Sequence, residues 1–293
     1  MEKSSLVTDS ISAMIDRQSP TVRRRRLARE LRRLREAAGL SAAQATKELG
    51  WAAGRINHLE SGRHGTDPSA LRDLMRLYGV DAPDRVEAIL ALGRQARQRG
   101  WWHSYTDVLD GDYLGFEAEA AGVTTYQPAV VPGLLQTRDY AAASAKASGA
   151  VTEADIERVV AARMERQVLL SSDLEVNAVI DESSLLRLAH RPDIAGEQLA
   201  QLVSMAEEAA RITIRMLPLS AGLHASMGSG FVILDYTDDL DKSLVYLEGR
   251  TGGTFLEKDE ELDDYRKVYS SLVQSSLSQL ETIKALKKLL KEV

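Results

Sequence analysis

The sequence predicts a mainly α-helical protein in which an N-terminal five-helix bundle is joined to a larger α+β domain of mixed helices and strands. Three observations lead to this prediction. The chain has 293 residues, more than one domain usually contains. Residues 1–100 carry 19 Lys and Arg against 12 Asp and Glu, a net charge of +7, and the remainder carries 18 against 31, a net charge of −13. Helical spacing dominates the first part, whereas helix and strand patterns alternate in the second.

Composition narrows the class of protein further. A hydrophobic content of 44% and a charged content of 27% are typical of a globular domain with a real core. The chain has no cysteine, which excludes disulfides, thiol nucleophiles and thiolate metal sites and suits a reducing compartment. No apolar run approaches the length of a membrane span. We therefore expect a cytoplasmic protein without a cofactor or metal, preceded by a flexible leader at residues 1–20.

The helices of the first domain are marked by apolar spacing and by caps. Leu27, Leu31 and Leu34 form one stripe within an arginine-rich segment that ends at Gly39. Ser41, with Gln44 three residues later, predicts a capping box and therefore the start of a second helix. A basic segment alone could be a solvated helix face, but the leucine stripe favours a packed helix.

A third and a fourth helix follow after short turns. The third comes after Gly50 and has Ile56 and Leu59 as its apolar pair, and the fourth opens at "DP" and buries an apolar stripe up to Tyr78. Two short helices joined by a glycine-containing turn are the helix-turn-helix signature. We assign residues 21–82 to this DNA-binding domain, 83–99 to a connector helix and 100–293 to the second domain.

The segments "LRRLREAAGLS", "ATKELG", "INHLESGR" and "LRDLMRLYGV" together resemble the Xre type of helix-turn-helix regulator, the class of the phage repressors. The resemblance covers about residues 23–81. It implies a repressor-like bundle that binds double-stranded DNA through the third helix. It also implies an ion pair between Arg35 and Glu60 that ties the first helix to the end of the third.

The residues expected to contact DNA depart from the usual pattern, because Ala42, Ala52, Ala53 and Gly54 stand where such regulators often carry hydrogen-bonding side chains. An alanine can still contact a thymine methyl, so some discrimination remains. We expect base contacts from Arg55, Asn57 and His58, although His58 could equally be an ordinary surface histidine. The phosphate contacts are expected from Ser41, Arg63, Arg24 and Arg25.

Two adjacent tryptophans, Trp101 and Trp102, follow the connector helix. They could stack on bases, but large aromatic side chains far more often fill a core. We therefore expect the pair to be buried between the two domains.

In the second domain, strand and helix patterns alternate. "LEVNAVI", "RITIRMLPL", "GFVILDY" and "SLVYLEG" read as strands, and the last two are expected to pair as an antiparallel hairpin. The rest of the chain is expected to be one long helical tail. Its apolar stripe could form a dimer interface or pack onto its own domain, and the stripe comprises Leu272, Leu277, Leu280, Ile283, Leu286 and Leu290.

The stretches "GWWHSY", "YQPAVVPGLLQTRDYA", "VAARMERQVLL", "VIDESSLLR" and "MLPLSAGLHASMGSGFVILDY" resemble the C-terminal domain of WhiJ-like regulators of actinobacteria, a domain of unknown function (family 5753). The resemblance implies a transcription regulator whose second domain binds a small partner protein, in an antitoxin-like arrangement. The alternative is a small-molecule effector pocket lined by "VPGLLQ" and "LPLSAGLH". We also expect a homodimer, because helix-turn-helix proteins commonly pair on palindromic operators.

An enzyme is the least favoured class. His190 and His224 are isolated in the sequence, and no acid is placed to orient His224. Asp181 and Glu182 are adjacent and would point to different faces of a helix. No nucleophile, base and orienting group can be assembled, so we expect no catalysis.

Overall fold

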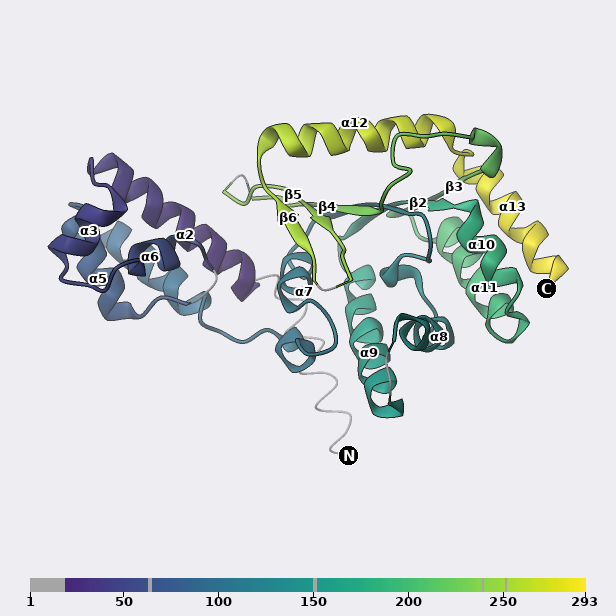
Figure 1. Ribbon diagram of the computed structural model, residues 1–293, viewed down its shortest axis with the longest axis horizontal. Coiled ribbons are helices and arrows are strands. Elements are labelled where there is room, and N and C mark those ends of the chain that lie inside the picture. The colour runs from purple at the N-terminus through teal and green to yellow at the C-terminus, as the bar shows by residue number, and fades with distance from the viewer. Residues whose placement is uncertain (1–18, 63–64, 150–151, 239, 251) are drawn as a thin grey trace. The chain divides into compact units, whose positions relative to one another are not determined.

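The computed structural model describes residues 19–62, 65–149, 152–238, 240–250 and 252–293. The chain divides into two compact units, one ending at His103 and the other containing Ser104–Val293. Figure 1 shows helices in the first unit and a helix-covered sheet in the second. Of the leader expected at residues 1–20, residues 1–18 lie outside the described residues, and Pro20 already belongs to the first helix. No described helix is long and apolar enough to cross a membrane.

The described part of the first unit is a bundle of five helices, as predicted. The leucines of the predicted stripe, Leu27, Leu31 and Leu34, are all buried in its core. Ser41 and Gln44 form the predicted capping box: the Ser41 hydroxyl accepts from the Gln44 N–H, and the Gln44 Oε1 accepts from the Ser41 N–H at 2.8 Å. The helices are α2 (Pro20–Ala37), α3 (Ala42–Glu48), α4 (Arg55–Glu60), α5 (Pro68–Leu77) and α6 (Pro83–Gln95).

Helix α6, which the sequence suggested as a connector, is part of this bundle. It packs against α2 and α5, and its Ile89 and Leu90 are buried in their common core. A Cβ on Gly93 would lie 2.4 Å from the Leu71 side chain, so α5 and α6 approach at a distance that only glycine permits. The helix ends at Gln95, before the end of the expected segment 83–99.

A buried ion pair joins α2 to the end of α4, as the resemblance implied. The Arg35 guanidinium donates to both carboxylate oxygens of Glu60 at 2.7 Å and to the Leu40 carbonyl at 2.7 Å. The two side chains are only 9% and 8% exposed. The hydrogen bonds that Arg35 donates to Glu60 raise the pKa of Arg35 above its ordinary value. The pair therefore fixes α4 against the longest helix of the bundle through bonds that water does not replace.

The second unit is built on one mixed sheet with the strand order β3-β2-β1-β4-β5-β6. The first three strands are parallel, with Val123 opposite Val176 and Ala178 opposite Ile214, and the others are antiparallel. The predicted hairpin is present, because Leu234 of β4 pairs with Leu244 of β5. The strands are β1 (Gly122–Gln127), β2 (Glu175–Asp181), β3 (Ile212–Leu217), β4 (Phe231–Asp235), β5 (Leu244–Leu247) and β6 (Thr254–Leu256).

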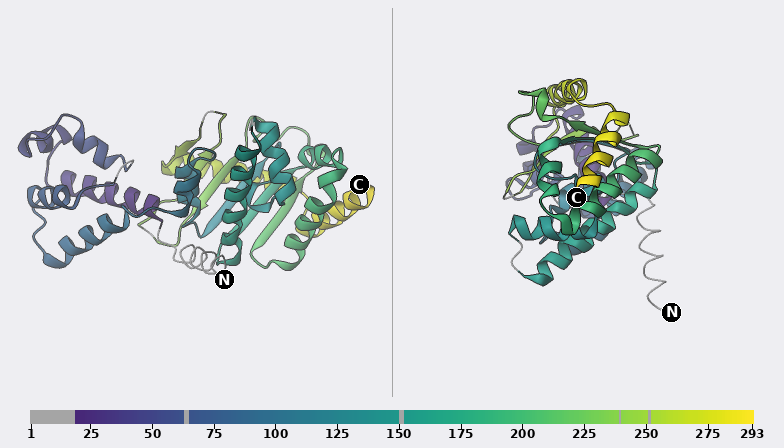
Figure 2. Two further views of the ribbon diagram at one scale, coloured as in Figure 1. Left: turned by 90° about the horizontal axis from the view of Figure 1, so that it is seen from below. Right: turned by 90° about the vertical axis from the view of Figure 1, so that its right-hand side faces the viewer.

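Helices cover both faces of this sheet, as Figures 1 and 2 show. Tyr126, Phe231 and Val245 point to the face covered by α12 and pack with its Leu262 and Leu272. Because strand side chains alternate, their neighbours point to the opposite face. The remaining helices are α7 (Gly111–Glu117), α8 (Arg138–Ser148), α9 (Glu153–Arg166), α10 (Glu182–Ala189), α11 (Pro192–Glu208), α12 (Asp259–Ser275) and α13 (Gln279–Glu292).

The expectation of one long helical tail was wrong. The short strand β6 precedes it, and Ser276–Ser278 separate α12 from α13 because the Ser278 side chain caps a new helix. The junction covers the edge strand β3: the Leu277 N–H donates to the Met216 carbonyl, and the Met216 N–H donates to the Thr282 hydroxyl. Leu272 and Leu286 are buried within their own unit. Leu272 and Leu286 therefore serve packing surfaces of this domain, whereas Leu280 is 63% exposed.

We expect Glu60→Ala to lower the free energy of unfolding of the first unit by about 3 to 5 kcal/mol, because it leaves the Arg35 guanidinium buried without a carboxylate. Urea denaturation of the full chain followed by tryptophan fluorescence measures this loss, since Trp51, Trp101 and Trp102 all lie in the first unit. Glu87→Ala, which removes an exposed partner of Arg94, is the matched control and should change little. Equal small losses in both variants would mean that the pair does not hold α4.

Candidate functional site

The exposed side of α4 carries the side chains from which we expect base contacts. Arg55, Asn57 and His58 are exposed, whereas Ile56 between them is buried in the core. The helix has six residues, and only its exposed side is free for other contacts. The structure therefore brings the three polar side chains together on one short surface.

Ala52 and Ala53 do not lie on α4, which corrects their expected place at the start of the third helix. Gly54 has φ of 81°, in the left-handed region, and the helix begins only after it. A right-handed helix cannot continue backwards through this conformation. Both alanines and Gly54 are exposed in the turn before α4. Any contact they make with DNA would come from a loop.

Two further features position the polar surface. The Arg55 guanidinium carbon lies 4.1 Å from the centre of the Trp51 ring, which is half-buried against the core of the bundle. This cation–π contact holds Arg55 while leaving it exposed. Ser41 is also exposed, although its hydroxyl caps α3. Arg63 lies outside the described residues.

Arg25, from which we expected a phosphate contact, is not exposed in the structure, and the contact stays a prediction. Its side chain is buried at 7% exposure, and a Cβ on Gly62 would lie 3.3 Å from the Arg25 Cα. The turn after α4 therefore packs directly on this part of α2. Arg24 is half-buried and donates to the Thr21 hydroxyl at 3.1 Å. An arginine run on a helix cannot place every side chain in solvent, because one face must meet the core.

The tryptophan pair lies at the end of the first unit. Trp102 is buried, and its ring lies so close to Gly100 that a Cβ there would be 2.3 Å away. Trp101 packs edge-on against it with ring centres 6.0 Å apart. The interdomain role of the pair stays a prediction.

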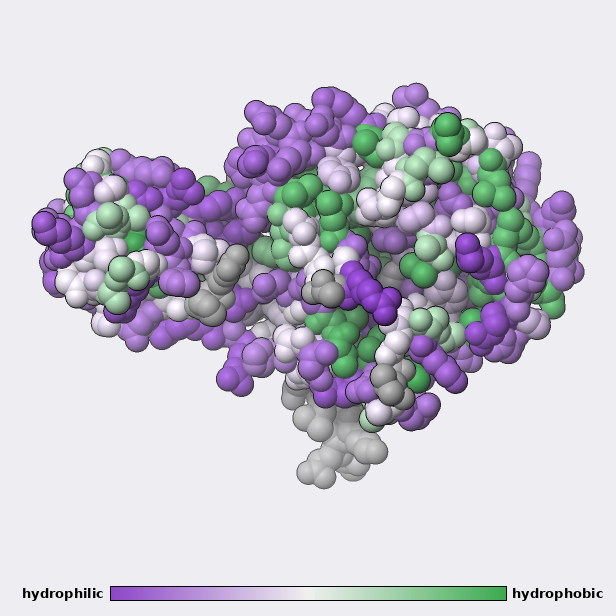
Figure 3. Space-filling view, in the orientation of Figure 1, coloured by the Kyte–Doolittle hydropathy of each residue, from purple (hydrophilic) through white to green (hydrophobic). Residues whose placement is uncertain are grey.

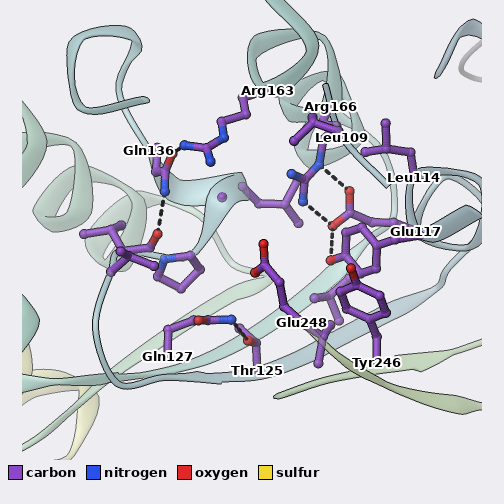
Figure 4. Close-up of a pocket in the computed structure, with 18 of the residues that line it drawn as sticks. Leu109, Leu114, Glu117, Thr125, Gln127, Gln136, Arg163, Arg166, Tyr246 and Glu248 are labelled. Carbon is purple, nitrogen blue, oxygen red and sulfur yellow. Dashed lines mark hydrogen bonds and ion pairs between the residues drawn. The ribbon is translucent and has the colours of Figure 1, made fainter. Parts of the chain in front are cut away.

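The second unit contains a cavity of about 310 Å³ on the face of the sheet opposite α12 (Figure 4). The cavity-facing residues of β1 are Val123, Thr125 and Gln127, which alternate with the residues that face α12. The other wall comes from "VPGLLQ", the segment from Val131 to Gln136, as the effector alternative expected. The segment "LPLSAGLH" does not line this cavity. The expected pocket is therefore present with only one of its two expected walls.

One side of the cavity is built on a buried ion pair. Arg166 of α9 donates to both oxygens of Glu117 at 2.7 and 2.8 Å, and Tyr113 donates to the same carboxylate at 2.7 Å. Burial alone would lower the pKa of Arg166, but the Glu117 charge raises it above its ordinary value. Gly133 permits this arrangement, because a Cβ there would lie 3.0 Å from the Arg166 guanidinium. Arg166 and Glu117 therefore neutralise each other at this corner of the cavity.

The charge of Arg163, one helical turn before Arg166, is not neutralised in this way. Its guanidinium donates to the Gln136 Oε1 at 2.6 Å, and no carboxylate among the described residues lies within ion-pair distance of it. Burial, and next the positive charge of Arg166, lower the pKa of Arg163 to about 10. Figure 4 shows Arg163 and Glu248 on the border of the same cavity. A guanidinium that is mostly buried and not neutralised is a candidate ligand-binding group.

His224 is not isolated, contrary to our expectation. The Tyr126 hydroxyl lies 3.3 Å from the His224 Nε2 and donates to the Asp181 Oδ2 at 3.2 Å. The His224 Nδ1 accepts a hydrogen bond from the Ser226 N–H, and the Ser226 hydroxyl donates one to the Ser229 carbonyl. Asp181 also caps α10 through the Ser183 N–H. The fold, rather than sequence spacing, connects these groups, and each has a structural partner.

Two family models match the chain. One, described as a helix-turn-helix domain, covers residues 26–88, and the other, described as a domain of unknown function (DUF5753), covers residues 111–288. The second match spans more than half of the chain. The chain belongs to the DUF5753 family. Its first unit is a helix-turn-helix domain, and its described DUF5753 domain is the mixed sheet with the cavity and its surrounding helices.

A curated protein whose name describes a transcriptional regulator is similar to part of the chain. The "HTH-type transcriptional regulator BetI" of Vibrio vulnificus (strain YJ016) is 30% identical over 88 residues, which is 30% of this chain and 41% of that protein. The match spans less than half of the relative's length. No solved structure matches the chain significantly.

Sequence reasoning missed the charged groups of the DUF5753 cavity. Arg163 and Arg166 stand in "VAARMERQVLL", which looks like an ordinary amphipathic helix with solvated arginines. Glu117 lies 49 residues from its partner Arg166. The only local signal was the spacing of the arginines, which places both on one side of a helix.

We expect Arg55→Ala to weaken binding to a duplex selected from a random pool by about 5- to 150-fold, which corresponds to the 1 to 3 kcal/mol of one base contact. Binding to unselected duplex should fall less, because only one charge is lost. Arg32→Ala, on an exposed part of α2, should change both affinities alike. Fluorescence anisotropy of the full chain at fixed salt measures both. Equal losses on the two duplexes in Arg55→Ala would show that Arg55 reads no sequence.

Proposed function

We propose that this protein is a one-component transcription regulator whose helix-turn-helix domain binds an operator and whose DUF5753 domain binds a small-molecule effector. DNA binding follows from the helix-turn-helix domain. The effector site is supported by one observation above the others. The DUF5753 cavity of about 310 Å³ contains Arg163, mostly buried and without a carboxylate partner among the described residues.

The volume and walls of the cavity fit this role. Ligand sites in proteins are concave, of about 300 Å³ or more, and combine apolar walls with a few placed polar groups. Here Val131, Pro132 and Leu134 supply apolar surface opposite the sheet. Gln136, which is buried, is held by its own bond to the Val131 carbonyl, so the partner of Arg163 is fixed in place. The site is therefore preformed, which reduces the entropy lost on binding.

We further propose that two copies of the chain act on one operator. Helix α4 is short, and only Arg55, Asn57 and His58 are placed for base contacts, which is little for selective binding by one copy. Pairing on a palindromic site doubles the contacts. Of the tail leucines, Leu272 and Leu286 are buried within their own domain, so these two are not available to the interface between the copies.

A small partner protein is the second candidate occupant of the DUF5753 domain, and one observation favours it. Leu219, Leu223 and Met227, in the segment between β3 and β4, are 58%, 89% and 61% exposed. Figure 3 also shows hydrophobic residues gathered on one face of this domain. Exposed apolar patches often mark protein interaction sites. We also propose that the protein has no catalytic role, as the sequence led us to expect.

We expect the low-molecular-weight fraction of an extract from the host cell to change the operator affinity of the full chain by about 5- to 150-fold, the usual range of allosteric coupling. Arg163→Met should abolish the response. Arg158→Met, which alters an exposed arginine on the same helix, should respond like the unaltered protein. Anisotropy with a labelled operator at fixed salt measures all three.

The outcomes of this measurement separate the two candidates. If operator affinity responds only to the polypeptide fraction of the same extract, the DUF5753 domain binds a partner protein and not a small-molecule effector. A response that persists in Arg163→Met would place the effector outside the cavity. No response to either fraction would contradict a regulatory role for the DUF5753 domain.

A further inference from the structure

Two opposite charges face the DUF5753 cavity without neutralising each other. Arg163 comes from α9, and Glu248 follows directly after β5. Both line the cavity, and the Glu248 charge is close enough to act on both Arg163 and Arg166. Yet the two side chains are not within ion-pair distance. Figure 4 shows Glu248 extending into the space between the sheet and the arginines.

Glu248 has no bonded partner among the described residues. Neither a hydrogen bond nor an ion pair to its carboxylate is formed by any of them, and the side chain is exposed at the cavity. A carboxylate in this position attracts a cationic group and repels a second anion. An anionic ligand that Arg163 attracts must therefore also carry a positive charge near Glu248.

The other charged groups of the cavity, and Thr125, are already bound within the fold. Glu117 is bound by Arg166 and Tyr113, and the Asp110 carboxylate accepts from the Tyr246 hydroxyl at 3.2 Å. Thr125 donates to the Phe231 carbonyl. A ligand could displace these bonds only by leaving buried groups unsatisfied, which is unfavourable. Recognition of charge is thus left to Arg163 and Glu248.

We propose that the DUF5753 cavity binds a small zwitterion, an amino-carboxylate of about the size of an amino acid, with its carboxylate on Arg163 and its ammonium group on Glu248. This inference rests on the proposed function and specifies its ligand. The planar guanidinium matches a carboxylate, with which it can form two parallel bonds. An anion without an amine would meet the unneutralised Glu248, and a cation without an acid would meet Arg163.

The size and lining of the cavity agree with this class of ligand. A volume of about 310 Å³ is at the small end of ligand sites. Val123, Val176 and Val232 face it from the sheet and offer apolar surface to a side chain. Binding would replace two partly desolvated charges by two charge-assisted pairs.

The test uses the full chain and four sets of probes, with binding measured by calorimetry and by thermal shift. The first set is the twenty L-amino acids. For each, the second is the carboxamide, which lacks the acid, the third is the acid without its amine, and the fourth lacks both charges. We expect saturable binding by at least one amino acid. Loss of either charge should weaken it by about 10- to 100-fold, the value of a hydrogen bond to a charged group.

Variants assign each charge to its residue. Arg163→Met should weaken the amino acid about as much as the loss of its carboxylate does, and should not weaken the carboxamide further. Glu248→Gln should do the same for the amine. Arg158→Met is the control that keeps both groups and should bind normally.

The results distinguish failure of the ligand class from failure of the effector site. Equal binding by a probe with one charge or none, with sensitivity to Arg163→Met, would overturn the zwitterion and leave the effector site standing. Binding of amino acids that is unchanged in both variants would place them outside the cavity and overturn the assignment. Absence of binding by all four sets would overturn the zwitterion, while a response of operator affinity to the small-molecule extract would still uphold the effector site.

Discussion

A buried guanidinium is unfavourable unless a carboxylate neutralises it, and both units of this protein are organised by that constraint. In the helix-turn-helix domain, Arg35 binds Glu60 through two bonds of 2.7 Å. In the DUF5753 domain, Arg166 binds Glu117 in the same two-pronged way. The first pair fixes the helix that carries the expected base contacts, and the second fixes a wall of the cavity. Each pair joins segments distant in sequence, so each forms only when the unit has folded.

Arg163 departs from this rule, and the departure gives the DUF5753 domain its proposed role. The Arg163 side chain is mostly buried, and its bonded partner among the described residues is the Gln136 amide. Arg166, one helical turn away, is paired with the Glu117 carboxylate. Stability alone does not account for this arrangement, since an apolar side chain would fill the space without a desolvated charge. Binding sites often retain such groups, because a ligand supplies the missing partner.

The sequence predicted those features that depend on neighbouring residues. The Ser41 and Gln44 capping box, the buried leucines of α2 and the hairpin of β4 and β5 all follow from spacing within a few residues. The family resemblance supplied the Arg35 and Glu60 pair. Features that depend on backbone conformation or on distant contacts were not visible. The left-handed Gly54 shortens α4, the three residues of β6 are too few for a pattern, and the Ser278 cap divides the tail.

The same limit applies to the candidate site. The sequence suggested "VPGLLQ" as one wall of an effector pocket, but it did not indicate the charges opposite that segment. Arg163, Arg166, Glu117 and Glu248 come from three separated parts of the chain, and only the sheet and α9 bring them to one cavity. The burial of Arg25, one of the residues expected to contact DNA, could not be read from the arginine run either.

The most direct test of this account compares the stability of two single substitutions, Arg163→Met and Arg166→Met. In urea denaturation, circular dichroism reports the helices of both units, and tryptophan fluorescence reports the helix-turn-helix domain alone, so the part of the dichroism transition that fluorescence does not follow reports the DUF5753 domain. We expect Arg166→Met to lower the free energy of unfolding by about 3 to 5 kcal/mol, because it leaves Glu117 buried and unpaired. Arg163→Met should change it by less than about 1 kcal/mol, since only one hydrogen bond to an amide is lost and a desolvated charge is removed with it. Equal large losses in both variants would show that Arg163 is a structural residue and would contradict its assignment to a ligand.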